Sequence, residues 1–593
     1  MKFPYGICDF RKIVTKGYYY CDRTDRIPKL EKHEYALFLR PRRFGKSLLL
    51  SMLINYYDLG RKDQFDEIFG KLKIGRNPTS LRNQFLVLEW DFSCIDPMGT
   101  AKDIRRVLHD HVNERIKRFI VTYREYLNIE IEIDPNNTIN SINSLITSVE
   151  ESGHPIYLFI DEYDNFANEV MMGVRRESND LYEALVYEEG PLKTLFKVVK
   201  SSTKESVFDR IFITGVSPVV MSDITSGYNI GKNIYQRPMF NDLCGFNEAE
   251  IKEIVDDIAD ECDLKKQDAE NALTMMRIYY NGSLFSRDAE KPVYNPTLAF
   301  YFLEIFEENC RFPYEMLDDN LATDEAKLRY VAQLPQGRNL LLDMIKDRHE
   351  TVIGGLAKRF GIQEMLTDQS KDKKFLASFL YYFGVLTNAG ETETGDIVLR
   401  VPNLVIYGLY IERIIRMLLP EPIERDDGKL AAKQLYQSGD MKSLCKFIET
   451  QYFQVFHNAD YKWANELTVK TAFLTLLYHD NLYIMDSELE IGRGVADLVM
   501  IIRPDMRRFK ILDILIEFKY VKLKDAELSG EQAKKLSLEE LQKLPLMKSA
   551  MDEAKNQLKR YGDALEKKYK NLRLRRYAVV SLGFERLWWK EEV

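Results

Sequence analysis

The sequence lacks the features that mark membrane proteins, zinc enzymes and disulfide-rich secreted domains. It has no run of about 18 uncharged apolar residues, so no membrane span is expected, and its first residues do not form a signal peptide. Seven histidines without an HExxH pair give no indication of a zinc hydrolase. The cysteines are never spaced as CxxC, which predicts seven free, buried thiols in a cytoplasmic protein and no zinc site: Cys8, Cys21, Cys94, Cys244, Cys262, Cys310 and Cys445.

Size and charge narrow the class further. At 593 residues the chain is too long for one hydrophobic core, so we expect three or four domains. Hydrophobic residues make up 45% and charged residues 30%, as in ordinary globular proteins with packed cores. The net charge of −8 argues against a protein whose whole surface coats nucleic acid, although a local basic patch would still be compatible with it.

A phosphate-binding loop is indicated near the N-terminus. The apolar residues 35–39 predict a strand, and the loop RPRRFGKS at residues 40–47 leads into an apolar helix. Backbone N–H groups at such a helix start bind phosphate, so we expect ATP here, with Lys46 reaching its β- and γ-phosphates and Ser47 holding Mg²⁺. The pattern GxxxxGK[ST] would place a glycine where this chain has Arg40. The expected nucleotide contacts in the loop are Arg42, Arg43, Phe44, Gly45, Lys46 and Ser47.

An acidic strand end supports this interpretation. Residues 156–160 are apolar and run into Asp161 and Glu162, which would lie at the carboxyl edge of a parallel sheet, where ligands bind. Asp161 is expected to coordinate Mg²⁺, and Glu162 to polarise the attacking water. A further apolar strand, residues 210–213, ends at Thr214 and Ser217.

These segments resemble a known family. The stretches FRKI at 10–13 and YYYCDRT at 18–24, together with the arginine-rich loop, are similar to the start of the bacterial AAA-ATPase-like family. Residues 214–219, 240–246 and 279–282 also resemble it. The resemblance implies that Arg40 is the family's own variant of the loop. It also implies that Thr214 or Ser217 is a polar sensor of the γ-phosphate, with a simple turn as the alternative.

The middle of the chain changes pattern. Helical periodicity over 248–262, 267–280 and 297–309 predicts a helical lid. Helical stretches from about residue 351, followed by a hairpin ending near 401, are typical of a winged helix. Such a module either contacts DNA or packs between domains. We favour packing, because the segment has no dense basic face.

The last third carries the pattern of a nuclease. Asp497 opens one apolar strand, and Glu517 with Lys519 closes the next, which resembles the core of the PD-(D/E)XK nuclease superfamily. The resemblance implies that Asp497, Glu517 and the Phe518 carbonyl bind Mg²⁺, with Mn²⁺ as an alternative, and that Lys519 is the catalytic lysine. It also implies an acid from a preceding helix, for which Glu466 is the candidate.

A later helix completes the expected site. Gln557 and Tyr561 are four residues apart on one helix face, and some branches of the superfamily place such a pair beside the active site. Residues 541–590 hold 13 Lys and Arg against 5 Asp and Glu, which is consistent with a nucleic-acid partner. A nuclease-like domain typically follows this ATPase in the family, so the resemblance spans nearly the whole chain.

The sequence therefore predicts an α/β multidomain protein. We expect a P-loop AAA+-like ATPase domain over residues 1–245, a helical lid over 246–345, a winged-helix-like region over 346–425 and an α/β PD-(D/E)XK nuclease-like domain over 426–593. The expected function is ATP binding and hydrolysis coupled to a Mg²⁺-dependent nuclease acting on DNA or RNA. The alternatives are an ATP-gated interaction protein with a silent nuclease fold, and nucleotide held as a structural ligand; homo-oligomerisation stays open.

Overall fold

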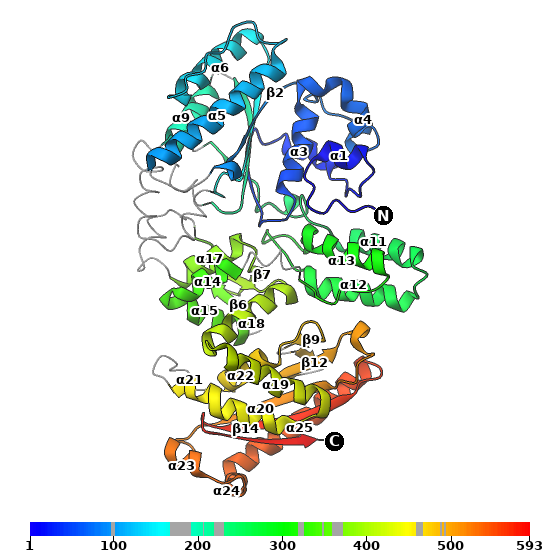
Figure 1. Ribbon diagram of the computed structural model, residues 1–593, viewed down its shortest axis with the longest axis vertical. Coiled ribbons are helices and arrows are strands. Elements are labelled where there is room, and N and C mark those ends of the chain that lie inside the picture. Colours follow the sequence, from blue (N-terminus) through cyan, green and yellow to red (C-terminus); the bar gives the residue numbers. More distant parts are fainter. Residues whose placement is uncertain are drawn as a thin grey trace. The chain divides into compact units, whose positions relative to one another are not determined.

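The structure is a computed structural model of the chain (Figure 1). It describes residues 1–95, 101–165, 191–204, 207–218, 230–317, 325–346, 349–357, 372–457, 466–486, 489–491 and 494–592. Contacts divide the chain into two units. The first comprises Met1–Cys310, Arg329–Arg338 and Val352–Asn403, and the second comprises Arg311–Leu328, Asn339–Thr351 and Leu404–Val593.

The first unit is built on a parallel sheet with the strand order β2-β3-β4-β1-β5. The central strands are almost continuously apolar and buried, as strands covered on both faces should be, whereas β2 alternates between buried and half-buried residues. Because β4 lies between β1 and β3, its end stands beside both the phosphate loop and the acidic strand end. The strands are β1 (Tyr35–Leu39), β2 (Leu86–Asp91), β3 (Ile156–Asp161), β4 (Phe208–Gly215) and β5 (Lys232–Asn233).

Helices cover both faces of this sheet. Figure 1 shows α5 (Ala101–Tyr123), α6 (Thr138–Ser152) and α9 (Pro191–Ser202) on one side, and α1 (Phe10–Thr15), α3 (Lys46–Tyr57) and α4 (Phe65–Phe69) on the other. The short α2 (Ile27–Leu30) and four 3₁₀ turns connect these elements; the turns are Thr24–Arg26, Leu59–Gln64, Lys73–Arg76 and Phe92–Cys94.

Three helices follow the sheet: α11 (Glu248–Glu261), α12 (Lys266–Tyr280) and α13 (Pro296–Asn309). They begin and end within one residue of the expected segments. Their N-termini explain this agreement, because Asn247 and Glu250 form a capping box at α11, and Asn295 caps α13 ahead of a proline. That these helices act as a lid remains a prediction.

The expectation of seven free, buried thiols is wrong. Cys262 and Cys310 form a disulfide with Cα atoms 5.7 Å apart, because α11 and α13 pack together and their C-terminal ends meet. A separation of 48 residues gives no spacing motif that the sequence could reveal. Cys8 and Cys94 are exposed, and only Cys244 and Cys445 are free thiols buried as expected.

The middle region contains α14 (Glu325–Gln333), α15 (Pro335–Lys346) and α17 (Lys373–Tyr382), with a sheet of order β6-β8-β7. Its strands are β6 (Glu350–Ile353), β7 (Thr387–Glu391) and β8 (Ile397–Arg400). The expected hairpin is therefore present, but part of the expected helical stretch, residues 358–371, lies outside the described residues. All side chains from Phe375 to Tyr382 of α17 are buried, so this helix packs inward along most of its length.

The second unit contains a mixed sheet of order β15-β14-β13-β12-β9, in which only β13 and β14 pair in parallel. A separate hairpin, β10 with β11, precedes β12. The strands are β9 (Tyr483–Asp486), β10 (Leu489–Ile491), β11 (Gly494–Ala496), β12 (Leu498–Ile502), β13 (Asp513–Val521), β14 (Leu574–Leu582) and β15 (Arg586–Glu592).

Two helices cover this sheet and carry candidate residues. The long α25 (Pro545–Lys568) buries Met551, Ala554 and Leu558 in one core with Leu515 and Val580 of the strands. On α22 (Glu466–Leu477), the Phe473 ring packs against Phe518 with ring centres 4.9 Å apart. The other helices are α18 (Leu404–Leu418), α19 (Pro422–Ser438), α20 (Met441–Phe447), α21 (Phe453–His457), α23 (Gly530–Lys535) and α24 (Leu538–Lys543), with one π-helical turn (Ile448–Tyr452) and one 3₁₀ turn (Pro504–Met506). No helix among the described residues is long and apolar enough to cross a membrane.

Candidate active sites

The phosphate loop, residues 40–47, buries the side chain of its own lysine, Lys46. Gly45 adopts φ +88° directly before α3, and Arg43 adopts φ +68°, so the loop turns through the left-handed region at two places. Lys46 is only 4% exposed and donates a hydrogen bond to the Pro41 carbonyl at 3.1 Å. Burial lowers the pKa of Lys46, while the charges of Glu162 and Asp161 act in the opposite direction. An anion in this loop would therefore meet a positive charge with few competing partners.

Asp161 is the meeting point of three elements. The Ser47 hydroxyl donates to Asp161 Oδ2 at 2.7 Å, and the Thr214 hydroxyl donates to Asp161 Oδ1. Ser47 lies in the first turn of α3, Asp161 ends β3 and Thr214 stands near the end of β4. A hydroxyl next to a carboxylate at a helix N-terminus is a set of oxygen donors that suits Mg²⁺. The sequence candidates Ser47, Asp161 and Thr214 thus converge, whereas Ser217 contacts a different acid, Asp164.

Glu162 has a strained backbone and a buried carboxyl group. Its φ of +47° is unusual for a residue other than glycine, and such strain gathers at functional sites. Burial raises the pKa of the Glu162 carboxyl, while the charge of Lys46 opposes this rise. The side chain is therefore held close to the loop lysine, in the environment that a general base requires.

Sequence reasoning missed Asp164. This carboxylate is 1% exposed and accepts hydrogen bonds from the Val216 and Ser217 N–H groups and from the Ser217 hydroxyl. It fixes the turn that follows β4, and a Cβ at Gly215 would lie 2.5 Å from Asp164 Oδ1. The spacing of Asp161 and Asp164, three residues apart, was the one signal in the sequence that pointed to it.

Arg40 has a structural role. Its guanidinium donates to the carbonyls of Leu39 and Tyr235 at 2.8 and 2.9 Å, and to the Phe240 carbonyl at 2.6 Å. It also lies 4.1 Å from the ring centre of Phe285. Burial lowers the pKa of Arg40 to about 10. The residue that replaces the usual glycine therefore fastens the start of the loop to the segment that leads into α11.

The remaining loop candidates point to different neighbours. Arg42 donates to the Asn165 side-chain oxygen at 2.8 Å, and the Phe44 ring contacts the Phe285 ring edge-on at 5.1 Å. The Arg43 carbonyl accepts from the Thr297 hydroxyl at 3.0 Å, which links the loop to α13. These contacts shape the loop, whereas Gly45, Lys46 and Ser47 stand where the loop enters α3.

A largely apolar cavity adjoins the loop at Gly45. It would take a flat aromatic base next to a phosphate held by the loop. Residues from the N-terminal segment, α3, the turn before α11 and α13 line it, among them Tyr19, Tyr20, Leu48, Leu243, Phe246 and Phe300.

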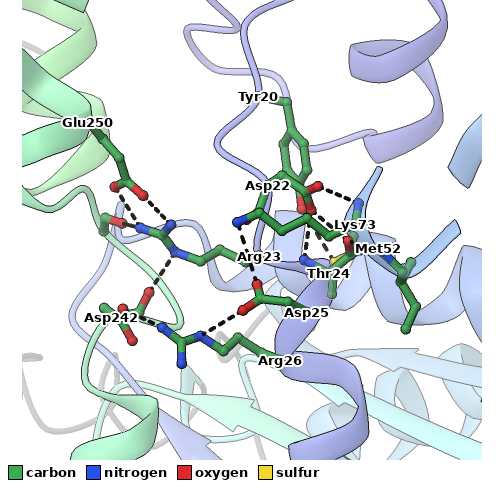
Figure 2. A network of polar contacts seen from close by, with 12 residues as sticks. Tyr20, Asp22, Arg23, Thr24, Asp25, Arg26, Met52, Lys73, Asp242 and Glu250 are labelled. Carbon is green, nitrogen blue, oxygen red and sulfur yellow. Dashed lines mark hydrogen bonds and ion pairs between the residues drawn. The ribbon is translucent and has the colours of Figure 1, made fainter. Parts of the chain in front are cut away.

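One wall of this cavity is held by a polar network, which Figure 2 shows. Arg23 forms a two-pronged ion pair with Glu250 of α11 and donates to the Asp242 and Gly245 carbonyls at 2.8 and 3.0 Å. Asp22, the residue before Arg23, accepts a hydrogen bond from the Lys73 N–H at 2.7 Å. Residues 20–26 thus join the 3₁₀ turn Lys73–Arg76 to the start of the three-helix segment.

The second site lies in the other unit, where two carboxyl groups face each other. The Asp497 N–H donates to Glu517 Oε1 at 3.2 Å, and the Phe518 N–H donates to Asp497 Oδ2 at 2.8 Å. Glu517 is 1% exposed. Burial, followed by the negative charge of Asp497, raises the pKa of Glu517 to about 9. Without a cation, Glu517 therefore carries a proton at neutral pH.

Helices α22 and α25 add charged groups to this pair. Burial raises the pKa of Glu466 on α22, and the charges of Lys519, Asp497 and Glu553 also act on it, so these groups form one cluster. Lys519 lies 3.6 Å from Glu553 Oε1 of α25. Glu553 is a residue that the sequence reasoning missed, although it stands one helical turn before Gln557.

Gln557 and Tyr561 occupy different surroundings. The Gln557 side-chain oxygen is buried and has no hydrogen-bond partner among the described residues. Tyr561 is 2% exposed and packs in the core, where its hydroxyl accepts from Arg560 at 3.0 Å. Gln557 therefore retains a free acceptor on the helix face that also carries Glu553, whereas Tyr561 is a packing residue.

The donors at this site fit one hydrated divalent cation. Among the described residues no group of three or more His, Cys, Asp or Glu side chains could by itself hold a metal ion. Mg²⁺ keeps several waters and is usually bound through one or two carboxylates, which Asp497 and Glu517 supply. A cation would replace the proton on Glu517.

Part of the basic excess of residues 541–590 is used within the fold. Arg575 pairs with Glu591, Arg576 with Asp563 and Glu566, and Lys555 with Glu592. Arg573 donates to the carbonyls of Phe509 and Arg507. Other basic residues of this segment are exposed, among them Lys543, Lys548, Lys559, Arg560 and Lys567.

Comparisons with known proteins match two segments of the chain. Residues 4–225 match the model of a family described as predicted AAA-ATPases, and residues 464–591 match the PD-(D/E)XK nuclease superfamily. The chain joins an AAA-ATPase-like domain to a PD-(D/E)XK nuclease-like domain. The sites around Lys46 and around Asp497 each lie within their matched segment.

Two individual proteins match this chain, one in a sequence comparison and one in a structural comparison. An "uncharacterized protein in vnfD 5′region" of Azotobacter chroococcum mcd 1 is 24% identical over 441 residues, which cover 72% of this chain and 73% of that protein. The crystal structure of Cdc6p from Pyrobaculum aerophilum covers 68% of this chain and 98% of its own, at 12% identity and a TM-score of 0.26. At that score the two folds are not shown to be alike.

Proposed function

We propose that the protein binds and hydrolyses Mg²⁺·ATP in its AAA-ATPase-like domain and cleaves nucleic acid in its nuclease-like domain with the help of a divalent cation. The observation that carries the first half is the convergence of Ser47, Asp161 and Thr214 beside Lys46. The second half rests on the facing pair of Asp497 and Glu517, with Lys519 in the same charged cluster.

Each residue of the ATP site has its own role in binding or hydrolysis. Lys46 binds the β- and γ-phosphates, and Ser47 and Asp161 hold Mg²⁺. Thr214 orients Asp161 and lies beside the position of the γ-phosphate. Glu162 holds a proton acceptor near the attacking water. The apolar cavity next to Gly45 receives the adenine.

At the nuclease site, a bound divalent cation supplies charge stabilisation and an activated water. Asp497 and Glu517 hold the cation, Lys519 orients the water or the scissile phosphate, and Glu466 adds negative charge from α22. Gln557 presents its unpaired side-chain oxygen to a water or the substrate. The exposed lysines of α25 contact the phosphate backbone.

Cleavage assays with DNA and RNA, with Mg²⁺ or Mn²⁺ and with or without ATP, test the nuclease half. Wild-type protein should cleave at least one of these substrates, and Asp497→Ala should not. Asp525→Ala is a matched control, because Asp525 is an exposed acid of the same domain outside the cluster. Absence of cleavage by wild type, or unchanged cleavage by Asp497→Ala, would refute this half.

Single-turnover ATP hydrolysis tests the other half. Glu162→Gln keeps the shape of the side chain and removes the proton acceptor, so ATP should still bind while hydrolysis falls by about 10²-fold or more. Equal hydrolysis in both proteins would instead favour nucleotide as a structural ligand.

One observation favours a second candidate function, an ATP-gated interaction protein with a silent nuclease fold. Lys519 is engaged by Glu553 at 3.6 Å, which draws its ammonium group toward α25. Under this alternative Lys46→Ala would abolish a partner or an oligomer, while Glu517→Ala would change nothing.

A further inference from the structure

A second lysine, Lys470, lies inside the nuclease site and was not among the residues that the sequence pattern indicated. It stands on α22 one turn after Glu466 and is 2% exposed. Lysine is almost never fully buried unless it is paired, because removing an ammonium group from water is costly. Its ammonium nitrogen lies 3.9 Å from Asp497 Oδ1. Lys470 thus faces the carboxylate expected to hold the metal.

The two oxygens of Asp497 have different neighbours. Oδ2 accepts the Phe518 N–H at 2.8 Å, while Oδ1 faces the ammonium group of Lys470. In sites with two metal ions, the ions lie about 3.5–4 Å apart and share a ligand between them. A second ion sharing Asp497 through Oδ1 would have to come close to the Lys470 ammonium group, with strong repulsion.

The charge of the cluster leads to the same conclusion. Its acids are Glu466, Asp497, Glu517 and Glu553, and its bases are Lys470 and Lys519. With every acid ionised, the cluster has two more negative than positive charges, which one divalent cation balances. A second cation would leave an excess of positive charge before any substrate phosphate arrives.

We propose that Lys470 is a built-in cation that takes the place of a second metal ion and restricts the nuclease site to one divalent cation. This assignment rests on the proposed metal-dependent nuclease function. Lys470 is a positioning residue, because it acts through Asp497. The substrate phosphodiester is then bound by one metal ion and by Lys519.

Counting bound Mn²⁺ tests the proposal without any activity measurement. The experiment uses the full chain without nucleotide, carrying Asp161→Asn to remove the carboxylate proposed to hold the cation at the ATP site, and follows free Mn²⁺ by electron paramagnetic resonance. One Mn²⁺ per chain should bind, and Asp497→Asn should remove it. Lys470→Met, which keeps the length of the side chain but not its charge, should bind two.

Two further variants separate charge from bulk. Lys519→Met removes the other lysine of the cluster, which pairs with Glu553 rather than with Asp497, and should still bind one Mn²⁺. Lys470→Arg keeps the positive charge and should also bind one. A count of two for Lys519→Met, or of one for a folded Lys470→Met, would overturn the assignment.

The parent protein itself provides an outcome that does not depend on Lys470 variants being folded. Two Mn²⁺ ions lost together on Asp497→Asn would overturn the role of Lys470 and leave the metal-dependent nuclease intact. No Mn²⁺ that depends on Asp497 would overturn the proposed nuclease function and, with it, this inference.

Discussion

The two candidate sites stabilise a carboxylate next to a buried lysine in opposite ways. At the ATP site, Asp161 accepts hydrogen bonds from two hydroxyl groups, those of Ser47 and Thr214. At the nuclease site, Glu517 faces a second carboxylate, Asp497, and its pKa rises to about 9. Hydroxyl donors stabilise the ionised carboxylate even without a metal ion. A neighbouring carboxylate instead favours the protonated form until a cation displaces the proton.

The largest expected effect comes from removing the loop lysine. Lys46→Met should weaken ATP binding by about 10²-fold or more, because the buried ammonium group that we propose to bind two phosphates is lost. The shift in thermal unfolding temperature on adding Mg²⁺·ATP should therefore disappear. Mn²⁺ binding that depends on Asp497 should be unchanged, and a loss of both would break the distinction between the sites.

Restoring the usual glycine of the loop should damage the protein. Arg40→Gly leaves four backbone carbonyls without their buried donor, so the first unit should lose about 3 kcal/mol or more of its free energy of unfolding. Chemical denaturation monitored in the first unit measures this. Arg76→Gly, at an exposed arginine of the same unit, is the control and should cost about 1 kcal/mol or less.

Proton release on metal binding distinguishes the nuclease site from the ATP site. The pKa of Glu517 in the folded protein, about 9, lies above its ordinary value, so the folded state binds the additional proton between the ordinary pKa and about 9. Without metal, the contribution of Glu517 to stability is therefore present at low pH and is lost as the pH rises through about 9. At pH 7.5, Mg²⁺ binding should release about one proton.

Calorimetry in two buffers of different ionisation enthalpy measures that proton. Glu517→Gln should release none, and its stability should no longer fall as the pH rises. Mg²⁺·ATP binding at the other site involves no such proton on Glu517 and is unaffected by this variant. Equal proton release by the wild type and Glu517→Gln would contradict the assignment.

The smallest expected effect is that of Thr214→Val. This change keeps the shape of the side chain and removes one hydroxyl donor from Asp161, which should lower single-turnover ATP hydrolysis by about tenfold. Ser217→Ala is the matched control, because Ser217 donates to Asp164 instead. A larger effect of Ser217→Ala would reverse the choice between the two sensor candidates.

The sequence predicted those features of the fold and of the sites that depend on residues close together in the chain. The apolar strands, the glycine-lysine-serine turn and the helices of residues 248–309 follow from local patterning and capping residues such as Asn247. The acidic strand end that follows the phosphate loop can also be recognised in the linear sequence. The same is true of the nuclease pattern, an acid on one strand and Glu-x-Lys on the next. The family resemblance added the significance of Arg40.

What the sequence could not reveal depends on distant parts of the chain. Lys470 looks like one more polar residue on a helix until α22 is placed against Asp497. Glu553 acquires a role only when α25 covers β13, and Cys262 meets Cys310 only because two helix ends coincide. The carbonyl partners of Arg40 lie about 200 residues away in the chain. Such partners are set by tertiary packing and leave no periodic signal.

The buried guanidinium of Arg40 also limits how the segment before α11 can move. Arg40 holds the carbonyls of residues 235 and 240, and Arg23 holds those of 242 and 245 together with Glu250. Hydrogen bonds and an ion pair thus hold both ends of the segment that leads into α11 against Arg23 and Arg40, on the side of the phosphate loop. A spectroscopic label placed between residues 235 and 250 should therefore report no motion relative to the phosphate loop when nucleotide binds.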